Sequence, residues 1–335
     1  MPAAGEAPAP SAVSPVVTEG TTSKQEEVSE PLTILLIDRL NTASRDQANF
    51  NQQLIQYLRR DPALSQPVAL LILSDSIRLL QRPTKESKLL IEALQRNVGT
   101  RSEGMALGEA FSLTPLEAQD MTPQMLESLD KMNQQLATQA VDDRVSATLN
   151  AFTIIAHLIA GNKGRKSIIW LSAAFPMSVV GSSQTGANAA KMEQVNALFS
   201  QERIAVYPVD VRGVVSAPDQ ASNSDTLFDT ITELGDPSFD EQATRKTAIV
   251  ESSNATMEDL AIRTGGKAFI NRNNLGPAIA QSLDDNLNYY TLEYYPSAVK
   301  WDGKFHRIKI RVTKHGLKLR YRSGYYAVNA PFTQP

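Results

Sequence analysis

The feature that most limits the possible folds of this chain is a short apolar run that ends in an acidic residue. Residues 32–37 are rich in isoleucine and leucine, Asp38 follows directly, and Asn41 and Thr42 come shortly after. A short run without polar alternation is typical of a strand buried on both faces of a parallel sheet. Because open α/β sheets bind polar ligands beyond the carboxyl ends of their strands, we expect Asp38 to face solvent at a binding site.

Similar apolar runs recur along the chain and alternate with helical patterns. The other predicted buried strands lie at 68–73, 167–172, 204–210 and 267–270. Residues 77–80 alternate like an edge strand and would form a hairpin with 68–73. The predicted helices lie at 43–60, 85–96, 123–160, 189–201, 257–263 and 275–287. This order predicts an α/β fold, a doubly wound and mostly parallel sheet with helices on both faces.

Changes in composition divide the chain into three parts. Residues 1–30 are mostly Pro, Ala, Ser, Thr, Val and Glu, which predicts a disordered tail. Residues 31–287 form the predicted α/β domain, with polar, weakly periodic insertions at about 97–125 and 213–250. Residues 288–328 alternate aromatic, apolar and basic side chains, which predicts a C-terminal antiparallel β-meander.

Composition also narrows the possible partners. The chain has 335 residues and a formal net charge of −3, so nothing in its charge favours nucleic acid as a partner. It has no cysteine and three histidines, which excludes thiolate sites and leaves too few imidazoles for a histidine-rich zinc site. We expect no transmembrane segment, because no apolar run is long enough, and no signal peptide, because the first residues lack a basic start and an apolar core.

Several motifs together carry a family resemblance. They lie at residues 35–42, 164–172, 206–213, 256–269 and 289–326. As a set they resemble the von Willebrand factor A (VWFA, VWA)-related proteins described from acidobacteria. The resemblance implies a VWA-like three-layer fold and a non-enzymatic module for protein binding or adhesion. It also implies a bacterial protein that is secreted or held at the cell envelope or periplasm; a cytoplasmic location is the alternative that the missing signal peptide leaves open.

The resemblance further implies a Mg²⁺ site of the metal-ion-dependent adhesion (MIDAS) type, in a degenerate form. The family motif is a D-x-S-x-S loop joined by a threonine and a second aspartate. Asp38 and Thr42 match the first and last loop positions, and Leu40 occupies the middle one, where it cannot ligate a metal. Thr148 matches the threonine, and Ser172 stands where the second aspartate is expected. One carboxylate and three hydroxyls would hold Mg²⁺ weakly or not at all.

An alternative interpretation needs no metal. Asp38 and Thr42 precede a predicted helix, and short polar side chains at such positions commonly cap the first turn of the helix. Both interpretations are open from the sequence.

Three further polar residues are candidates for contact with a ligand or for a supporting role. Asn41 lies in the first loop, and Asp75 and Asp210 each follow a predicted strand. The two aspartates would reach the same edge of the sheet as Asp38 and add negative field there. They could equally pair with the nearby Arg78 or Arg212.

An enzymatic function is the alternative to a binding module. The spacing Asp38-x-Leu40-x-Thr42 echoes the D-x-D-x-T loop of haloacid-dehalogenase-type phosphotransferases, in which Asp38 would be the nucleophile and Ser172 would bind phosphate. Leu40 would stand at the position of the general acid and cannot donate a proton. We therefore expect no enzyme, and a protein ligand bound by the loops after residues 38, 172 and 210 together with the insertion at 213–250.

Overall fold

A five-stranded sheet lies at the centre of the computed structural model. The structure describes residues 30–97, 121–175, 177, 185–213, 239–290, 292, 302–313, 316–317 and 319–327. The strands of the sheet are β1 (Leu32–Asp38), β2 (Ala63–Leu73), β3 (Ile77–Glu86), β4 (Lys166–Ser172) and β5 (Ile204–Asp210). The predicted tail at 1–30 lies outside the described residues apart from residue 30.

The strand order confirms the predicted doubly wound sheet. It runs β3-β2-β1-β4-β5, with β1, β2, β4 and β5 parallel and β3 antiparallel to β2 at one side. Leu36 at the centre lies opposite Leu71 on one side and Trp170 on the other. All four parallel strands end at the same side of the sheet, which we call the carboxyl edge; the side where they begin is the amino edge.

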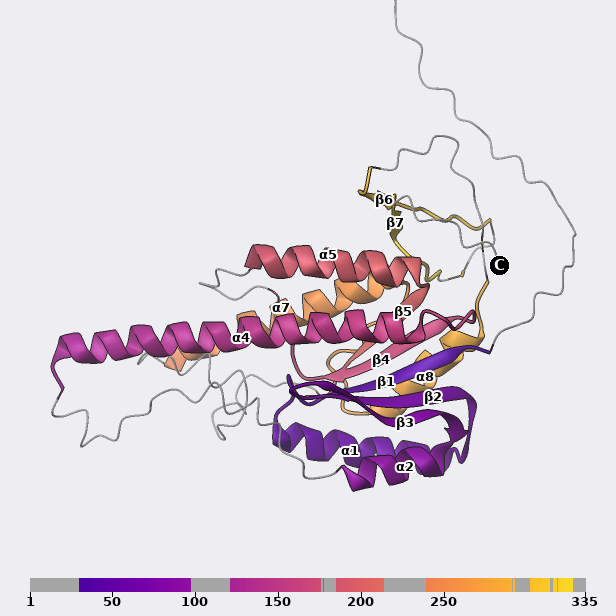
Figure 1. Ribbon diagram of the computed structural model, residues 1–335, viewed down its shortest axis with the longest axis horizontal. Coiled ribbons are helices and arrows are strands. Elements are labelled where there is room, and N and C mark those ends of the chain that lie inside the picture. Colours follow the sequence, from indigo (N-terminus) through magenta and orange to yellow (C-terminus); the bar gives the residue numbers. More distant parts are fainter. Residues whose placement is uncertain are drawn as a thin grey trace, which may run out of the picture.

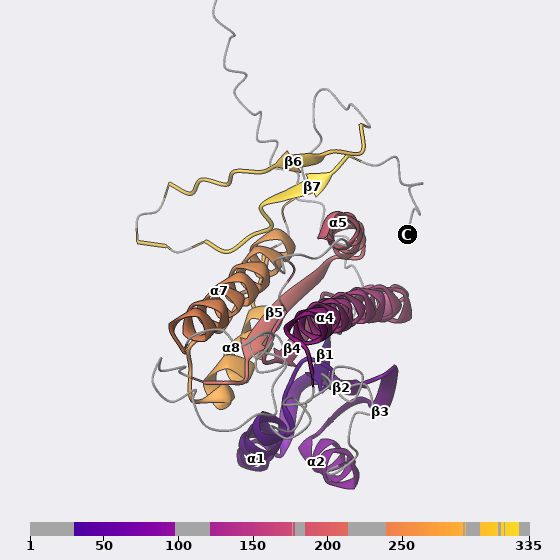
Figure 2. The ribbon, with the colours of Figure 1, turned by 90° about the vertical axis from the view of Figure 1, so that its left-hand side faces the viewer.

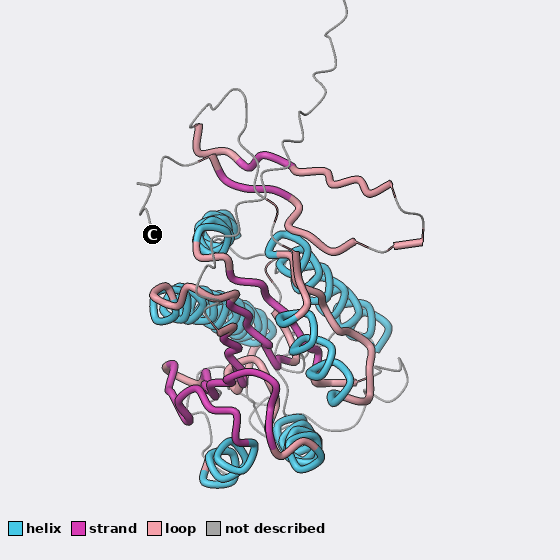
Figure 3. Tube along the Cα trace, turned by 90° about the vertical axis from the view of Figure 1, so that its right-hand side faces the viewer, coloured by secondary structure: helices cyan, strands magenta, loops and turns pink. Residues whose placement is uncertain are grey.

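Helices cover both faces of the sheet (Figures 2 and 3). One face packs against α4 (Pro123–Ile159), α5 (Thr185–Gln201) and α7 (Phe239–Thr264). The other face packs against α1 (Ser44–Arg60), α2 (Ser87–Arg96) and α8 (Leu275–Leu287). At 37 residues, α4 is far longer than the strands, and its N-terminal part extends past the carboxyl edge (Figure 1).

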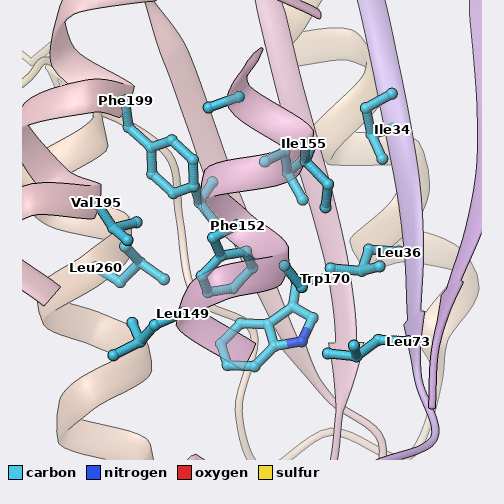
Figure 4. Packing of buried hydrophobic residues seen from close by; sticks show 14 of the residues in the cluster. Ile34, Leu36, Leu73, Leu149, Phe152, Ile155, Trp170, Val195, Phe199 and Leu260 are labelled. Carbon is cyan, nitrogen blue, oxygen red and sulfur yellow. The ribbon is translucent and has the colours of Figure 1, made fainter. Parts of the chain in front are cut away.

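The core under α4 is built around aromatic rings. Phe152 of α4 meets Trp170 of β4 edge to face, with ring centroids 5.0 Å apart. Phe175 and Phe199 pack on the same pair, at 5.2 Å from Trp170 and 5.6 Å from Phe152. Figure 4 shows Phe152, Trp170 and Phe199 in this core, with Leu36 and Leu73 on the other side of the indole. Edge-to-face pairs of this kind stabilise beyond the area they bury.

The predicted helix at 123–160 is confirmed as α4, whereas the predicted helix at 257–263 begins too late. The insertion predicted at 213–250 ends earlier, because α7 already begins at Phe239 and is 26 residues long, so the predicted helix at 257–263 is only its last part. The insertion predicted at 97–125 likewise overlaps α4, which begins at Pro123, where Thr122 accepts a hydrogen bond from the Met125 N–H and so caps the helix. Residues 98–120 and 214–238 lie outside the described residues.

The strand predicted at 267–270 is reduced to a single parallel bridge between Val209 and Phe269. The preceding turn is nevertheless tight against β5. A Cβ atom on Gly266 would lie 1.9 Å from the carbonyl oxygen of Val206, so only glycine fits there. Thr264 at the end of α7 accepts the Val206 N–H through its hydroxyl at 3.0 Å. These contacts dock the end of α7 on the last strand of the sheet.

The predicted C-terminal meander is present as two short antiparallel strands in the described part of the chain. They are β6 (Phe305–Arg307) and β7 (Gly324–Tyr326). Arg322 anchors this hairpin, because its guanidinium donates to the carbonyl oxygens of Ser200 at 2.6 Å and Ile204 at 3.2 Å. Burial, with repulsion from other arginines, lowers the pKa of Arg322 to about 10. The hairpin therefore packs against the C-terminal end of α5 and the beginning of β5.

Candidate functional site at the carboxyl edge

Asp38 lies at the carboxyl edge, at the end of the central strand, as predicted from its place after the apolar run. The expectation that it faces solvent is wrong, because its exposed fraction is 0%. It has the same strand parity as Leu36, which packs in the core cluster under α4, so Asp38 lies on the sheet face that α4 covers. The end of a parallel strand is here enclosed by its neighbours and by the projecting helix.

Four hydrogen bonds reach the buried carboxylate of Asp38. Asn41 donates its main-chain N–H at 3.0 Å and its side-chain amide at 2.8 Å. The indole N–H of Trp170 donates at 3.1 Å and the hydroxyl of Ser172 at 2.9 Å. Burial raises the pKa of Asp38, and these hydrogen bonds act in the opposite direction. The carboxylate is held by protein donors on both of its oxygens.

Two threonines complete the cluster. The side-chain amide of Asn41 also donates to the hydroxyl oxygen of Thr148 at 2.8 Å, and Thr148 in turn donates to the carbonyl of Arg144. Thr42 accepts the main-chain N–H of Ala173, which follows β4, at 3.1 Å. The structure thus brings together Asp38, Asn41, Thr42, Thr148 and Ser172 from three distant segments of the chain.

The alternative that Asp38 and Thr42 cap the next helix is wrong. The N-cap of α1 is Ala43, and no side chain makes a cap hydrogen bond there. Both polar side chains instead point to β4 and the turn after it. Their role is to join the first loop to the neighbouring strand.

Asp210, the second predicted supporting aspartate, is engaged with a neighbouring arginine. Asp210 is buried and forms an ion pair with Arg212, whose guanidinium nitrogens lie 2.9 and 2.7 Å from its two oxygens. The pairing alternative for Asp210 is therefore confirmed. Asp75 is exposed in the turn between β2 and β3. Both remain candidates for contact with a ligand only by their place at the carboxyl edge.

Two participants were not predicted from the sequence. Trp170 was assigned to a buried strand, and its N–H was not foreseen as a donor to Asp38. Arg144 precedes Thr148 by one helical turn, so both residues lie on the same side of α4. Arg144 is 6% exposed, and its Nη1 atom is buried without a hydrogen-bond acceptor. Burial lowers the pKa of Arg144, while the charge of Asp38 acts to raise it.

The residues at this edge fit a divalent metal poorly. Mg²⁺ prefers several oxygen ligands with free lone pairs, but both oxygens of Asp38 already accept protein donors. Leu40, at the middle loop position, is buried in the apolar core. Across the described ranges, no group of three or more His, Cys, Asp or Glu side chains is placed to hold a metal ion. Mg²⁺ binding stays a prediction.

No family model and no curated protein matches this sequence. Solved structures do, with 10–13% identity in the three cases below. An aerotolerance-related membrane protein of Bacteroides fragilis matches with 13% identity over 76% of this chain and 98% of its own, at a TM-score of 0.35. BatB, a conserved hypothetical protein of Bacteroides thetaiotaomicron, has 10% identity, the same coverages and a TM-score of 0.32.

A third match is a von Willebrand factor type A structure from Catenulispora acidiphila, with 10% identity, 68% of this chain, 43% of that chain and a TM-score of 0.29. Likenesses this distant do not identify what the chain binds. In the part of the chain that the structure describes, no helix has both the length and the apolarity to cross a membrane. The function is therefore argued from the α/β architecture and from the polar cluster at its carboxyl edge.

Proposed function

We propose that this chain is a VWA-type module that binds a protein ligand at its carboxyl edge and catalyses no reaction. The observation that carries this proposal is the convergence of Asp38, Thr148 and Ser172 at the end of the central strands. Side chains from three distant segments meet where an open α/β sheet binds its ligands. The resemblance of the motifs to VWFA-related proteins supplies the class of ligand, a protein.

The hydrogen bonds of Asp38 argue against the phosphotransferase alternative. A nucleophilic carboxylate must present a free lone pair to the phosphorus atom of its substrate, whereas the two oxygens of Asp38 already accept four protein donors. Assaying a panel of phosphoesters tests this point. We expect no phosphate release; release that Asp38→Asn abolishes would restore the enzymatic interpretation.

For the compartment, we propose the bacterial cell envelope or the extracellular side, which follows from the resemblance of the motifs. Cytoplasm is the alternative. Fractionation of the source cells, with detection of the chain by antibody, distinguishes the two locations directly.

Site-specific photo-crosslinking tests the proposed binding edge. A photoreactive amino acid replaces Ser76, which is exposed in the turn at the carboxyl edge. The matched control carries it at Lys163, which is exposed at the amino edge in the turn before β4. In the source cells we expect a discrete protein adduct from position 76 and none from position 163. The same adducts from both positions, or none from position 76, would reject the carboxyl edge as the binding surface.

A further inference from the structure

Side chains of both charge signs, most of them buried, lie near the carboxyl edge. The acidic members are Asp38, Asp142 and Asp210, and the basic members are Arg39, Arg144 and Arg212. Their formal charges cancel. A divalent cation binds where negative charge is in excess, so these six side chains together offer it little attraction.

Among these side chains, Arg144 is the one next to the cluster around Asp38. Thr148, one turn further along α4, lies 2.8 Å from the amide nitrogen of Asn41, and that nitrogen lies 2.8 Å from Asp38. Arg144 lies one helical turn before Thr148, on the side of the N-terminal part of α4 that projects past the carboxyl edge. The guanidinium is thus a fixed positive charge beside the only carboxylate of the predicted metal site, and the pKa of Arg144 responds to the charge of Asp38.

The guanidinium also has unused bonding capacity. Its Nη1 is buried and has no acceptor, and a buried donor left without a partner is unfavourable. Arginine in such a setting typically pairs with a carboxylate, because its planar fork matches the two oxygens. A carboxylate suits this edge better than a phosphate dianion, since the buried Asp38 and Asp142 would repel the second negative charge.

We propose that Arg144 is the resident cation of this edge in place of a divalent metal, and that its Nη1 receives a carboxylate from an acidic side chain of the bound protein. Binding at the edge would then be independent of Mg²⁺ or Mn²⁺. This inference rests on the proposed protein-binding function and names the ligand chemistry of that same edge. It also accounts for the poor fit of the cluster to a metal.

The test uses formate as the smallest carboxylate probe, with the full chain. Thermal unfolding is followed in sodium formate and in sodium chloride at equal ionic strength, for the wild type and for Arg144→Met. We expect formate to raise the melting temperature of the wild type relative to chloride, and Arg144→Met to weaken formate binding by about tenfold or more. Calorimetry of the wild type with MnCl₂ is expected to show no binding.

Three results would overturn the inference: a formate effect equal in both proteins or absent in the wild type, phosphate stabilising the wild type more than formate does, or Mn²⁺ binding that Asp38→Asn abolishes. Should Arg144→Met fail to fold, Arg144→Lys retains the charge without the fork and is expected to weaken formate binding less than Met would, yet measurably. The crosslinking test and the formate test can fail separately. If position 76 gives no adduct while formate still binds, the protein ligand is rejected but Arg144 remains an anion site.

Discussion

Strands β1 and β4 carry one buried polar pair at each end, and the two pairs are built differently. At the amino edge Thr33 lies opposite Ser167, with their hydroxyls 2.8 Å apart. At the carboxyl edge Asp38 and Ser172 are joined at 2.9 Å. Five residues separate the pairs along each strand, so they lie on opposite faces of the sheet.

The amino-edge pair belongs to a network of neutral groups under α8. The amide of Asn286 donates to Thr33 at 3.3 Å and to Gln66 at 2.6 Å, and Gln66 donates to the carbonyl of Leu283 at 2.8 Å. Each group is uncharged and hydrogen-bonded within the network, with the exception of the Asn286 side-chain oxygen, which is buried and accepts no hydrogen bond. Such a network joins a helix to a sheet and requires no counter-charge.

The carboxyl-edge pair contains a full charge, so it needs more from its surroundings. Four donors hold the carboxylate and a buried guanidinium lies nearby. The comparison teaches that equal burial of polar groups has unequal consequences. A neutral network can lose one member at moderate cost, whereas a charged cluster left with one unpaired charge loses much more stability. Four predictions test this difference, and the first three run from the largest expected effect to the smallest.

The largest loss is expected for Asp38→Ala. The change strands the donors of Asn41, Trp170 and Ser172 and removes the negative charge near Arg144, so the free energy of unfolding should fall by about 3–5 kcal/mol. Urea denaturation followed by circular dichroism measures it. A loss below about 1 kcal/mol would mean that the buried cluster contributes no more than an exposed one.

Arg212→Met should rank second, with a loss of about 2–3 kcal/mol, because it leaves Asp210 buried without its guanidinium. The loss should be smaller than for Asp38→Ala, since Asp210 still accepts the main-chain N–H of residue 212 at 3.0 Å. The same denaturation series gives the value. Equal losses of unfolding free energy for Arg212→Met and Asp38→Ala would show that the hydrogen bond that Asp210 retains does not limit the loss.

At the amino edge, Asn286→Ala should cost about 1–2 kcal/mol, because the amide that joins Thr33 to Gln66 disappears but no charge is exposed. The control is Asn288→Ala, an exposed amide two residues on, for which the change should stay within about 0.5 kcal/mol. If Asn286→Ala destabilises as strongly as Asp38→Ala, the contrast between neutral and charged clusters fails.

The last prediction concerns pH, and for it only the direction of the change in stability is predicted. Burial raises the pKa of Asp38 above its ordinary value of 3.8, so the folded chain keeps this proton at pH values where the unfolded chain has released it. Stability should therefore fall as pH rises from 3.8 through the raised pKa. Asp38→Asn should lack this contribution, and parallel pH profiles for the two proteins would contradict it.

Local sequence patterns determined the frame of this protein. Mainly apolar runs without alternation, such as residues 32–37 and 167–172, determined the parallel strands, because a strand buried on both faces is apolar at most positions. Their ends determined the carboxyl edge, where Asp38 meets Ser172. Thr148 lies on α4 and was expected there only from the resemblance of the motifs. The first turns of α7, from Phe239 onward, have a weak apolar pattern, so they could not be predicted from the sequence.

Only the tertiary structure decided what the residues at that edge do. Strand register and the long α4 bury Asp38, turn the indole N–H of Trp170 toward it and place Arg144 beside it. The hydrogen bonds that Trp170 and Ser172 donate to Asp38 join segments more than a hundred residues apart, so no local window of sequence contains them. A side chain's residue type states which charge it can carry; its neighbours in space decide whether that charge is open to a ligand or already compensated.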